Sequence, residues 1–286
     1  MKLEEAKSYV NEAKALGTEI VCITGGEPML YPNLVKEIAS ECNQLSIPEI
    51  WLFTNGFWAS NTSRTHAMVK DLKKQGLTKM FFSVDAFHQG YVPIKFVKNA
   101  IKASRKADLE VCVDARFIGQ LDENNRYNSA TRSLLESLRS LLSNTEIIRA
   151  QPLFVGRAAE SLSKRVKKKP FTEILEEKCP GAWPGGTLKS PQGVDVDEFG
   201  FVTICPGLSI GNTHTTSLRR ILGDYNYQSH VVTAALHEGG IEGLMNLASR
   251  NGFIPEKAYV SGCHLCYEAR KFLRSFFPDA FVFLAK

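Results

Sequence analysis

The chain has 286 residues, with 35 Lys and Arg against 30 Asp and Glu, so its formal net charge is only +5. A charge this small gives no argument for nucleic-acid binding, and no apolar run approaches the roughly 20 residues that span a bilayer. The seven cysteines are an odd number, and no N-terminal segment has the pattern of a signal peptide. We therefore expect a globular cytoplasmic protein without disulfides.

The first half of the sequence alternates strand-like and helix-like segments. An opening helix is indicated by apolar residues at helical spacing (Leu3, Ala6, Val10 and Ala13), with Gly17 just after its end. The strand-like runs that follow are 19–24, 49–54, 79–84, 109–113 and 147–154, and the helix-like segments between them are 32–45, 62–75, 93–107 and 129–142. This alternation predicts βαβ units and a parallel sheet.

Polar residues stand where the first four strand-like runs end, namely Thr24, Thr54, Ser83 and Asp114. In βα barrels the carboxyl ends of the strands carry the active site. The sequence therefore predicts a site at this edge, although strands that simply become polar as they reach solvent remain an alternative for any one of these residues.

A basic segment separates this half from the rest of the chain. Residues 164–169 read Lys-Arg-Val-Lys-Lys-Lys, which favours a solvated linker. Further on, 194–205 predicts a β-hairpin that turns at Gly200, and 267–273 predicts a helix. The expected division is a partial barrel over 1–158, a linker over 159–178 and a small cysteine-bearing α+β domain over 179–286.

Four cysteines of the C-terminal part lie in sequence that we expect to be rich in loops. They are Cys179, Cys205, Cys263 and Cys266, the last two spaced as Cys-x2-Cys. Four thiolates suit either a tetrahedral zinc ion or an iron–sulfur cluster, and this spacing serves both. His264 is expected beside the site or at the surface rather than as a ligand.

Three motifs of the first half resemble those of radical S-adenosylmethionine (radical SAM) enzymes. Gly25-Gly26-Glu27-Pro28 is similar to the family's GGEP motif, Thr54-Asn55-Gly56 to its TNG element and Ser83-Val84-Asp85 to its Ser-x-Asp segment. They occur in the family's order. The resemblance implies an α/β fold, a partial (β/α)6 TIM-like barrel that lacks its first strand. An ordinary aldolase-like barrel with a zinc site is a weaker hypothesis, because it leaves the three motifs unexplained.

The first motif is where the resemblance places the methionine ammonium group of S-adenosylmethionine. Gly25 and Gly26 lack a Cβ atom and let a ligand approach the backbone closely. Pro28 fixes the turn, and Glu27 offers a carboxylate to a cation. We therefore expect these four residues to bind the cofactor.

The resemblance places further cofactor-binding residues at the following strand ends. Asn55, Ser83 and Asp85 belong to the matching motifs, with Ser83 near the ribose or the methionine carboxylate. Arg116 is expected to pair with that carboxylate, although a surface salt bridge is the alternative. His88 is expected at the same carboxyl edge of the predicted barrel, either in contact with substrate or as a structural hydrogen-bonding group.

The defining motif of the superfamily, Cys-x3-Cys-x2-Cys, does not occur in these 286 residues. Its three thiolates hold a [4Fe–4S] cluster that cleaves S-adenosylmethionine to a radical, which then abstracts hydrogen from the substrate. The catalytic residues are therefore unknown. Two hypotheses stay open: an N-terminally truncated form of a radical SAM enzyme, or a non-catalytic degenerate barrel that binds an iron–sulfur cluster or zinc.

The C-terminal part resembles a SPASM or twitch domain, on the hairpin from Gly200 to Cys205 and the Gly211-Asn212 pair after it. Four cysteines fit the twitch version, which holds one auxiliary [4Fe–4S] cluster. The resemblance also implies a small-molecule or peptide substrate and a reductant such as a flavodoxin or ferredoxin. It implies no membrane partner.

Overall fold

The computed structural model describes residues 1–179 and 186–278. The chain folds as two compact units, Lys2–Pro152 and Leu153–Lys286. The basic segment therefore belongs to the second unit.

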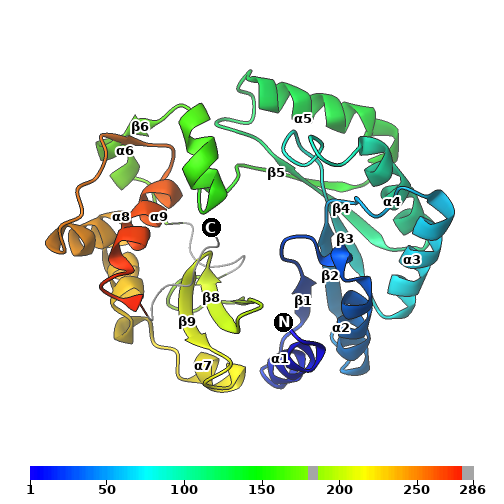
Figure 1. Ribbon diagram of the computed structural model, residues 1–286, viewed down its shortest axis with the longest axis horizontal. Coiled ribbons are helices and arrows are strands. Elements are labelled where there is room, and N and C mark those ends of the chain that lie inside the picture. Colours follow the sequence, from blue (N-terminus) through cyan, green and yellow to red (C-terminus); the bar gives the residue numbers. More distant parts are fainter. Residues whose placement is uncertain (180–185, 279–286) are drawn as a thin grey trace. The chain divides into compact units, whose positions relative to one another are not determined.

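The N-terminal unit is built on one five-stranded sheet with strand order β1-β2-β3-β4-β5 (Figure 1). Every neighbouring pair of strands is parallel. The strands are β1 (Ile20–Ile23), β2 (Glu49–Thr54), β3 (Lys79–Ser83), β4 (Glu110–Arg116) and β5 (Glu146–Ala150). All carboxyl ends of the strands therefore meet at one edge.

A helix opens this unit and one follows each of the first four strands, as the sequence predicts. The helices are α1 (Leu3–Ala15), α2 (Pro32–Gln44), α3 (Thr62–Lys74), α4 (Ile94–Lys106) and α5 (Arg126–Ser137). The helix α5 begins earlier than expected because the side chain of Asn125 caps it, accepting hydrogen bonds from two backbone amides. The unit is thus the α/β, partial TIM-like barrel that the sequence predicts.

The two faces of the sheet have different side chains. Leu52 and Phe82 are fully buried in the core, on the face that α2, α3 and α4 cover (Figure 1). Side chains alternate along a strand, so Trp51, Phe53 and Phe81 lie on the opposite face. There the ring centroids of Phe53 and Phe81 stack 4.2 Å apart, and those of Trp51 and Phe81 lie 5.2 Å apart.

A buried lysine joins three strands at the edge opposite the carboxyl ends. The Nζ atom of Lys79 lies 2.8 Å from the Glu110 carboxylate and 2.9 Å from that of Glu146. Burial lowers the pKa of Lys79, but the hydrogen bonds to these two glutamates outweigh it and the pKa is raised. This ion-pair cluster therefore links β3, β4 and β5.

The C-terminal unit is an α+β fold with two small antiparallel sheets. One contains β7 (Asp195–Val196), β8 (Phe201–Cys205) and β9 (Leu208–Asn212), and the other pairs β6 (Lys169–Pro170) with β10 (Ala258–Tyr259). The helices are α6 (Phe171–Leu175), α7 (Leu218–Gly223), α8 (Val231–Arg250) and α9 (Gly262–Leu273). None of the described helices combines the length and apolarity needed to cross a membrane.

Two features of this unit differ from the simple expectation. The segment 159–178 contains α6, and Ile174 of α6 is fully buried in the unit's core. Cys263 and Cys266 lie in the first turns of a helix rather than in a loop, because the Ser261 side chain caps α9 by accepting a hydrogen bond from the His264 amide. The predicted hairpin is confirmed, with Gly200 at a φ of 78° in its turn.

Candidate functional site

The loop after β1 presents open backbone at the carboxyl edge of the sheet. Gly25 and Gly26 are both exposed, and a Cβ atom at either would meet no other atom within 4 Å. Gly25 has a φ of 129°, which side-chain-bearing residues rarely adopt. A ligand can therefore approach this backbone closely.

Glu27 ties this loop to the end of the neighbouring strand. Its Oε1 accepts hydrogen bonds from the Met29 amide at 3.0 Å and from the Thr54 hydroxyl at 2.8 Å. Its Oε2 accepts one from the Asn55 amide at 2.7 Å. The carboxylate that the sequence offers to a cation thus already has three donors within the protein.

The turn after β2 is organised around Thr54 and Asn55. The Thr54 hydroxyl, while donating to Glu27, accepts hydrogen bonds from the Gly56 amide at 3.1 Å and from Nε1 of Trp58 at 3.0 Å. The side-chain oxygen of Asn55 accepts one from the Phe57 amide at 2.9 Å. The GGEP and TNG motifs therefore form one hydrogen-bonded structure.

The loop after β3 is held by polar side chains that the sequence did not single out. Gln89 accepts a hydrogen bond from the Asp85 amide at 2.8 Å and donates one to the Ser83 carbonyl at 3.3 Å. The hydroxyl of Thr131 in α5 accepts one from the Ala86 amide at 3.0 Å. No motif marks Gln89 or Thr131, because each acts through backbone groups of this loop.

Arg116 is engaged by a carboxylate of the protein itself. Its Nη2 and Nε atoms donate to Oδ2 of Asp114 at 2.6 Å and 3.2 Å, and its Nη1 donates to the Gln151 carbonyl at 3.4 Å. Asp114 is paired in register with Ser83 of the next strand. Its Oδ1 atom is buried and has no hydrogen-bond partner. The guanidinium fork thus forms the salt bridge that was the alternative for Arg116.

Three carboxylates of this edge act on the ring of His88. Its pKa is raised, first by the hydrogen bond with Asp85 and then by the charges of Asp85, Asp114 and Glu27, although burial opposes the shift. These carboxylates belong to the ends of three different strands. Because these strands are parallel members of one sheet, the three carboxylates lie at the same edge.

The four C-terminal cysteines are close enough to influence one another electrostatically. Burial is the main reason why the pKa of Cys205 rises to about 11 and that of Cys263 to about 12, and the other thiolates contribute to both shifts. The guanidinium of Arg270, a residue only 4% exposed, opposes the rise. Within residues 1–179 and 186–278, no three Cys, His, Asp or Glu side chains are grouped as ligands of a single metal ion.

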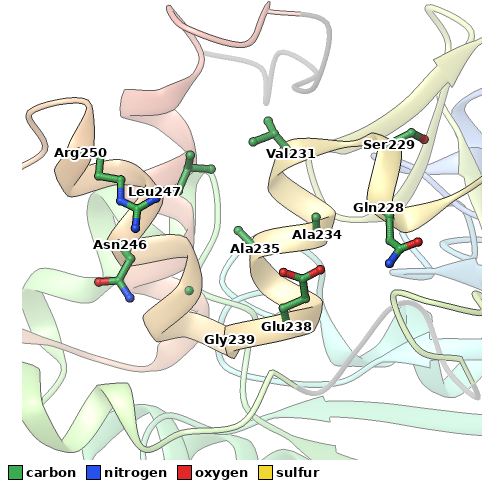
Figure 2. A pocket seen from close by; sticks show the side chains of 11 residues that line it. Gln228, Ser229, Val231, Ala234, Ala235, Glu238, Gly239, Asn246, Leu247 and Arg250 are labelled. Carbon is green, nitrogen blue, oxygen red and sulfur yellow. The ribbon is translucent and has the colours of Figure 1, made fainter.

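A cavity of about 600 Å³ lies along α8. Gly240 interrupts this helix with a φ of 59°, and side chains from both halves line the cavity (Figure 2). A Cβ atom at Gly243 would collide with the Ala235 carbonyl, so the two halves approach closely. None of the residues predicted from the sequence as site residues lines this cavity.

Comparison with known proteins shows what the N-terminal part of the chain is similar to. Residues 1–127 match the family model described as the radical SAM superfamily. The chain is 34% identical to a GTP 3',8-cyclase of Desulforamulus reducens over 88 residues, 31% of this chain and 25% of that protein. It is 25% identical to the GTP 3',8-cyclase of Helicobacter pylori over 185 residues, 62% of this chain and 53% of that protein. Residues 1–127, which lie in the N-terminal part of the chain, are therefore similar to the radical SAM superfamily.

The chain spans between a quarter and about half of the length of these curated relatives. Among solved structures, the radical S-adenosylmethionine methyltransferase TsrM from Kitasatospora setae aligns with 96% of this chain and 55% of its own. The TM-score is 0.38 and the identity is 11%.

Proposed function

We propose that the protein is a radical SAM enzyme, and that the carboxyl edge of the N-terminal sheet binds S-adenosylmethionine. The observation that carries this proposal is the Glu27 clamp, which holds the exposed backbone of Gly25 and Gly26 beside the TNG turn. The family match over residues 1–127 covers both motifs. The hydrogen bonds of Glu27 to the end of β2 hold this loop while the backbone of Gly25 and Gly26 stays exposed. Exposed backbone carbonyls can accept hydrogen bonds from an ammonium group.

Within this proposal each predicted residue has a distinct part. Backbone carbonyls of the glycines receive the methionine ammonium group, and the Glu27 carboxylate supplies the negative charge behind them. Asn55 and Ser83 contact the nucleoside side of the cofactor. Asp85, whose side chain is 0% exposed, contributes to the site by holding the loop after β3 and the ring of His88. Arg116, which Asp114 holds through a salt bridge while its side chain stays 33% exposed, is the partner of the methionine carboxylate.

The hydrogen-abstracting chemistry comes from a [4Fe–4S] cluster, which supplies the electron that cleaves the cofactor. The three cysteines for that cluster do not occur as Cys-x3-Cys-x2-Cys in these 286 residues. A radical SAM enzyme needs three such thiolates, so under this proposal they come from sequence outside these 286 residues. Sequencing the gene around this reading frame tests this: an in-frame Cys-x3-Cys-x2-Cys supports it, and the absence of one refutes it.

We further propose that Cys179, Cys205, Cys263 and Cys266 hold an auxiliary [4Fe–4S] cluster in a twitch-like domain. The chemistry of the donor set supports this, because four cysteine thiolates are the usual ligands of such a cluster and these thiols influence one another's pKa. In the described residues no three of them are grouped as ligands of one metal ion, so the cluster would have to draw them together. Zinc remains the alternative metal, and anaerobic purification followed by metal analysis decides between them. Zinc without iron would overturn the cluster.

Radical SAM enzymes act on a substrate and draw electrons from a reductant. A flavodoxin or ferredoxin is the proposed reductant here, and the substrate is a small molecule or a peptide. The relatives are named as enzymes that act on GTP, but their alignments cover only part of each protein. We therefore do not propose GTP as the substrate of this protein. A non-catalytic metal-binding barrel remains the second candidate, favoured by the missing cysteine motif; it predicts iron in the protein but no deoxyadenosine on reduction.

Binding of S-adenosylmethionine to the full chain tests the central proposal. Gly25→Ala introduces a Cβ atom at a φ of 129°, and we expect the affinity to fall by at least about tenfold, or 1.4 kcal/mol. Glu19→Gln, at an exposed position just before β1, is the matched control and should bind as the parent does. Calorimetry measures both. A parent chain that takes up no cofactor, or equal affinities for the two variants, would contradict the proposal.

A further inference from the structure

His88 is held at the carboxyl edge by a single buried carboxylate. Its Nδ1 atom lies 2.9 Å from Oδ1 of Asp85, and the same oxygen accepts hydrogen bonds from the backbone amides of Phe87 at 2.9 Å and His88 at 3.0 Å. The Asp85 side chain is 0% exposed. The loop therefore fixes the carboxylate, and the carboxylate fixes the orientation of the ring.

The second oxygen of Asp85 makes the arrangement dependent on His88. Oδ2 is buried and has no hydrogen-bond partner. Burying a carboxylate with an incomplete set of partners is costly unless an opposite charge stands beside it. The imidazolium of His88 is the cation in direct contact with this carboxylate.

The other ring nitrogen of His88 is available for chemistry. The side chain is 41% exposed although Nδ1 is turned to a buried group, and within the described residues Nε2 forms no hydrogen bond of its own. The remaining charges that act on the ring are Asp114, which is already paired with Arg116, and Glu27. His88 thus lies at the carboxyl edge, where the charge of Glu27 in the GGEP motif acts on its ring.

We propose that Asp85 and His88 form an acid–base pair in which Nε2 of His88 exchanges a proton with an oxygen or nitrogen atom of the molecule transformed at this edge. In the donating direction, the Nε2–H bond breaks and an O–H or N–H bond forms on that molecule. The ring becomes neutral, Nδ1–H stays bonded to Asp85, and water returns the proton to Nε2. This rests on the proposed function, because it takes the carboxyl edge as the reaction site.

The geometry matches what proton transfer requires. A carboxylate at Nδ1 holds an imidazole ring in one orientation and one tautomer, which leaves Nε2 as the nitrogen that exchanges a proton with a bound molecule. The raised pKa keeps Nε2 protonated further into the neutral range.

Acylation of the full chain by diethyl pyrocarbonate tests the pair without a known substrate. The reagent attacks neutral, accessible imidazole, so the pH profile of His88 modification, followed by peptide mass spectrometry, reports both its exposure and its titration. Asp85→Asn keeps a carbonyl oxygen for the two amides and removes the charge. We expect His88 to react, and its midpoint to shift to lower pH in this variant. His66, a half-buried histidine of α3 whose ring bonds the Thr62 carbonyl, is the internal control whose reaction profile Asp85→Asn should leave unchanged.

Two results would overturn the pair: a His88 that does not react at any pH, or a midpoint that Asp85→Asn leaves unchanged. If that variant does not fold, ring NMR of the parent chain, with His88→Gln to assign the signal, decides the same question from the titration and tautomer of His88. Adding S-adenosylmethionine separates this inference from the proposed function. Severalfold slower acylation of His88, with His66 unaffected, supports both. If His88 titrates as expected but S-adenosylmethionine does not bind, the result supports the Asp85–His88 pair and refutes the proposed cofactor site.

Discussion

Replacing Glu27 by Gln tests whether this side chain connects the loops after β1 and β2. Glutamine has nearly the same shape, but one carboxylate oxygen becomes an amide donor. The three present donors are the Met29 and Asn55 amides and the Thr54 hydroxyl. In one orientation of the glutamine the new NH2 group faces the Asn55 amide, and in the other it faces the Met29 amide. Either way a backbone donor loses its acceptor.

The magnitude follows from the bonds that change. A hydrogen bond to a charged group contributes about 1.5–3 kcal/mol, and an unsatisfied buried donor adds to its loss. Because the site is only partly buried, water compensates part of this cost. We expect the free energy of unfolding of the N-terminal unit to fall by about 2 kcal/mol. At about 2–4 °C per kcal/mol, the midpoint of thermal unfolding would fall by about 4–8 °C.

Urea unfolding followed by tryptophan fluorescence measures this change. Trp51 and Trp58 both lie in the N-terminal unit, and Trp58 donates a hydrogen bond to Thr54 beside the clamp. Glu19→Gln removes a charge from an exposed position before the same strand and serves as the control. If Glu27→Gln unfolds within about 0.5 kcal/mol of that control, the range of ordinary surface substitutions, then the clamp is not what holds these loops together.

Three other substitutions have outcomes that the structure sets. His88→Gln should lower the free energy of unfolding most below pH 6.5, the ordinary pKa of histidine, because the hydrogen bond with Asp85 favours the protonated ring. This loss should become smaller as the pH rises through the raised pKa of His88. A loss that does not change with pH would contradict this. Cys263→Ala should abolish the visible absorbance of the chain after anaerobic reconstitution with iron and sulfide, whereas Cys22→Ala in the other unit should keep it; equal spectra would exclude Cys263 as a ligand. Lys79→Met leaves two carboxylates without their shared cation and should cost about 1–2 kcal/mol in urea unfolding, and an unchanged midpoint would show that the ion pairs contribute nothing.

The order and type of elements in the N-terminal unit could be predicted because their signals are local. Apolar periodicity and the residues at the ends of each segment are visible within a short window. The fifth strand shows the limit of this reasoning: it ends at Ala150, not 154, because Pro152 has no amide hydrogen for a continued ladder. The start of α9 was missed because Ser261 and Gly262 are typical of a loop until the Ser261 cap is seen.

The contacts among the predicted site residues could not be predicted from the sequence. Glu27 and Asn55 stand 28 positions apart, and their hydrogen bond depends on the pairing of β1 with β2. The sequence predicts that the Glu27 carboxylate interacts with a cationic ligand, because an unpaired carboxylate attracts a cation. In the folded chain this carboxylate also accepts a hydrogen bond from the backbone amide at the end of β2. The Asp85–His88 contact, three positions apart, is the exception that a local pattern alone could have indicated.

The three carboxylates of the carboxyl edge are compensated in three different ways. Glu27 accepts hydrogen bonds from neutral groups, Asp114 is paired with Arg116, and Asp85 is paired with His88. An arginine stays charged at any physiological pH, whereas a histidine can lose its proton. The edge therefore has negative charge to offer a cation such as a sulfonium or an ammonium group. Of its two positive groups only His88 can release a proton, so the charge of the whole edge near neutral pH follows the state of that one ring.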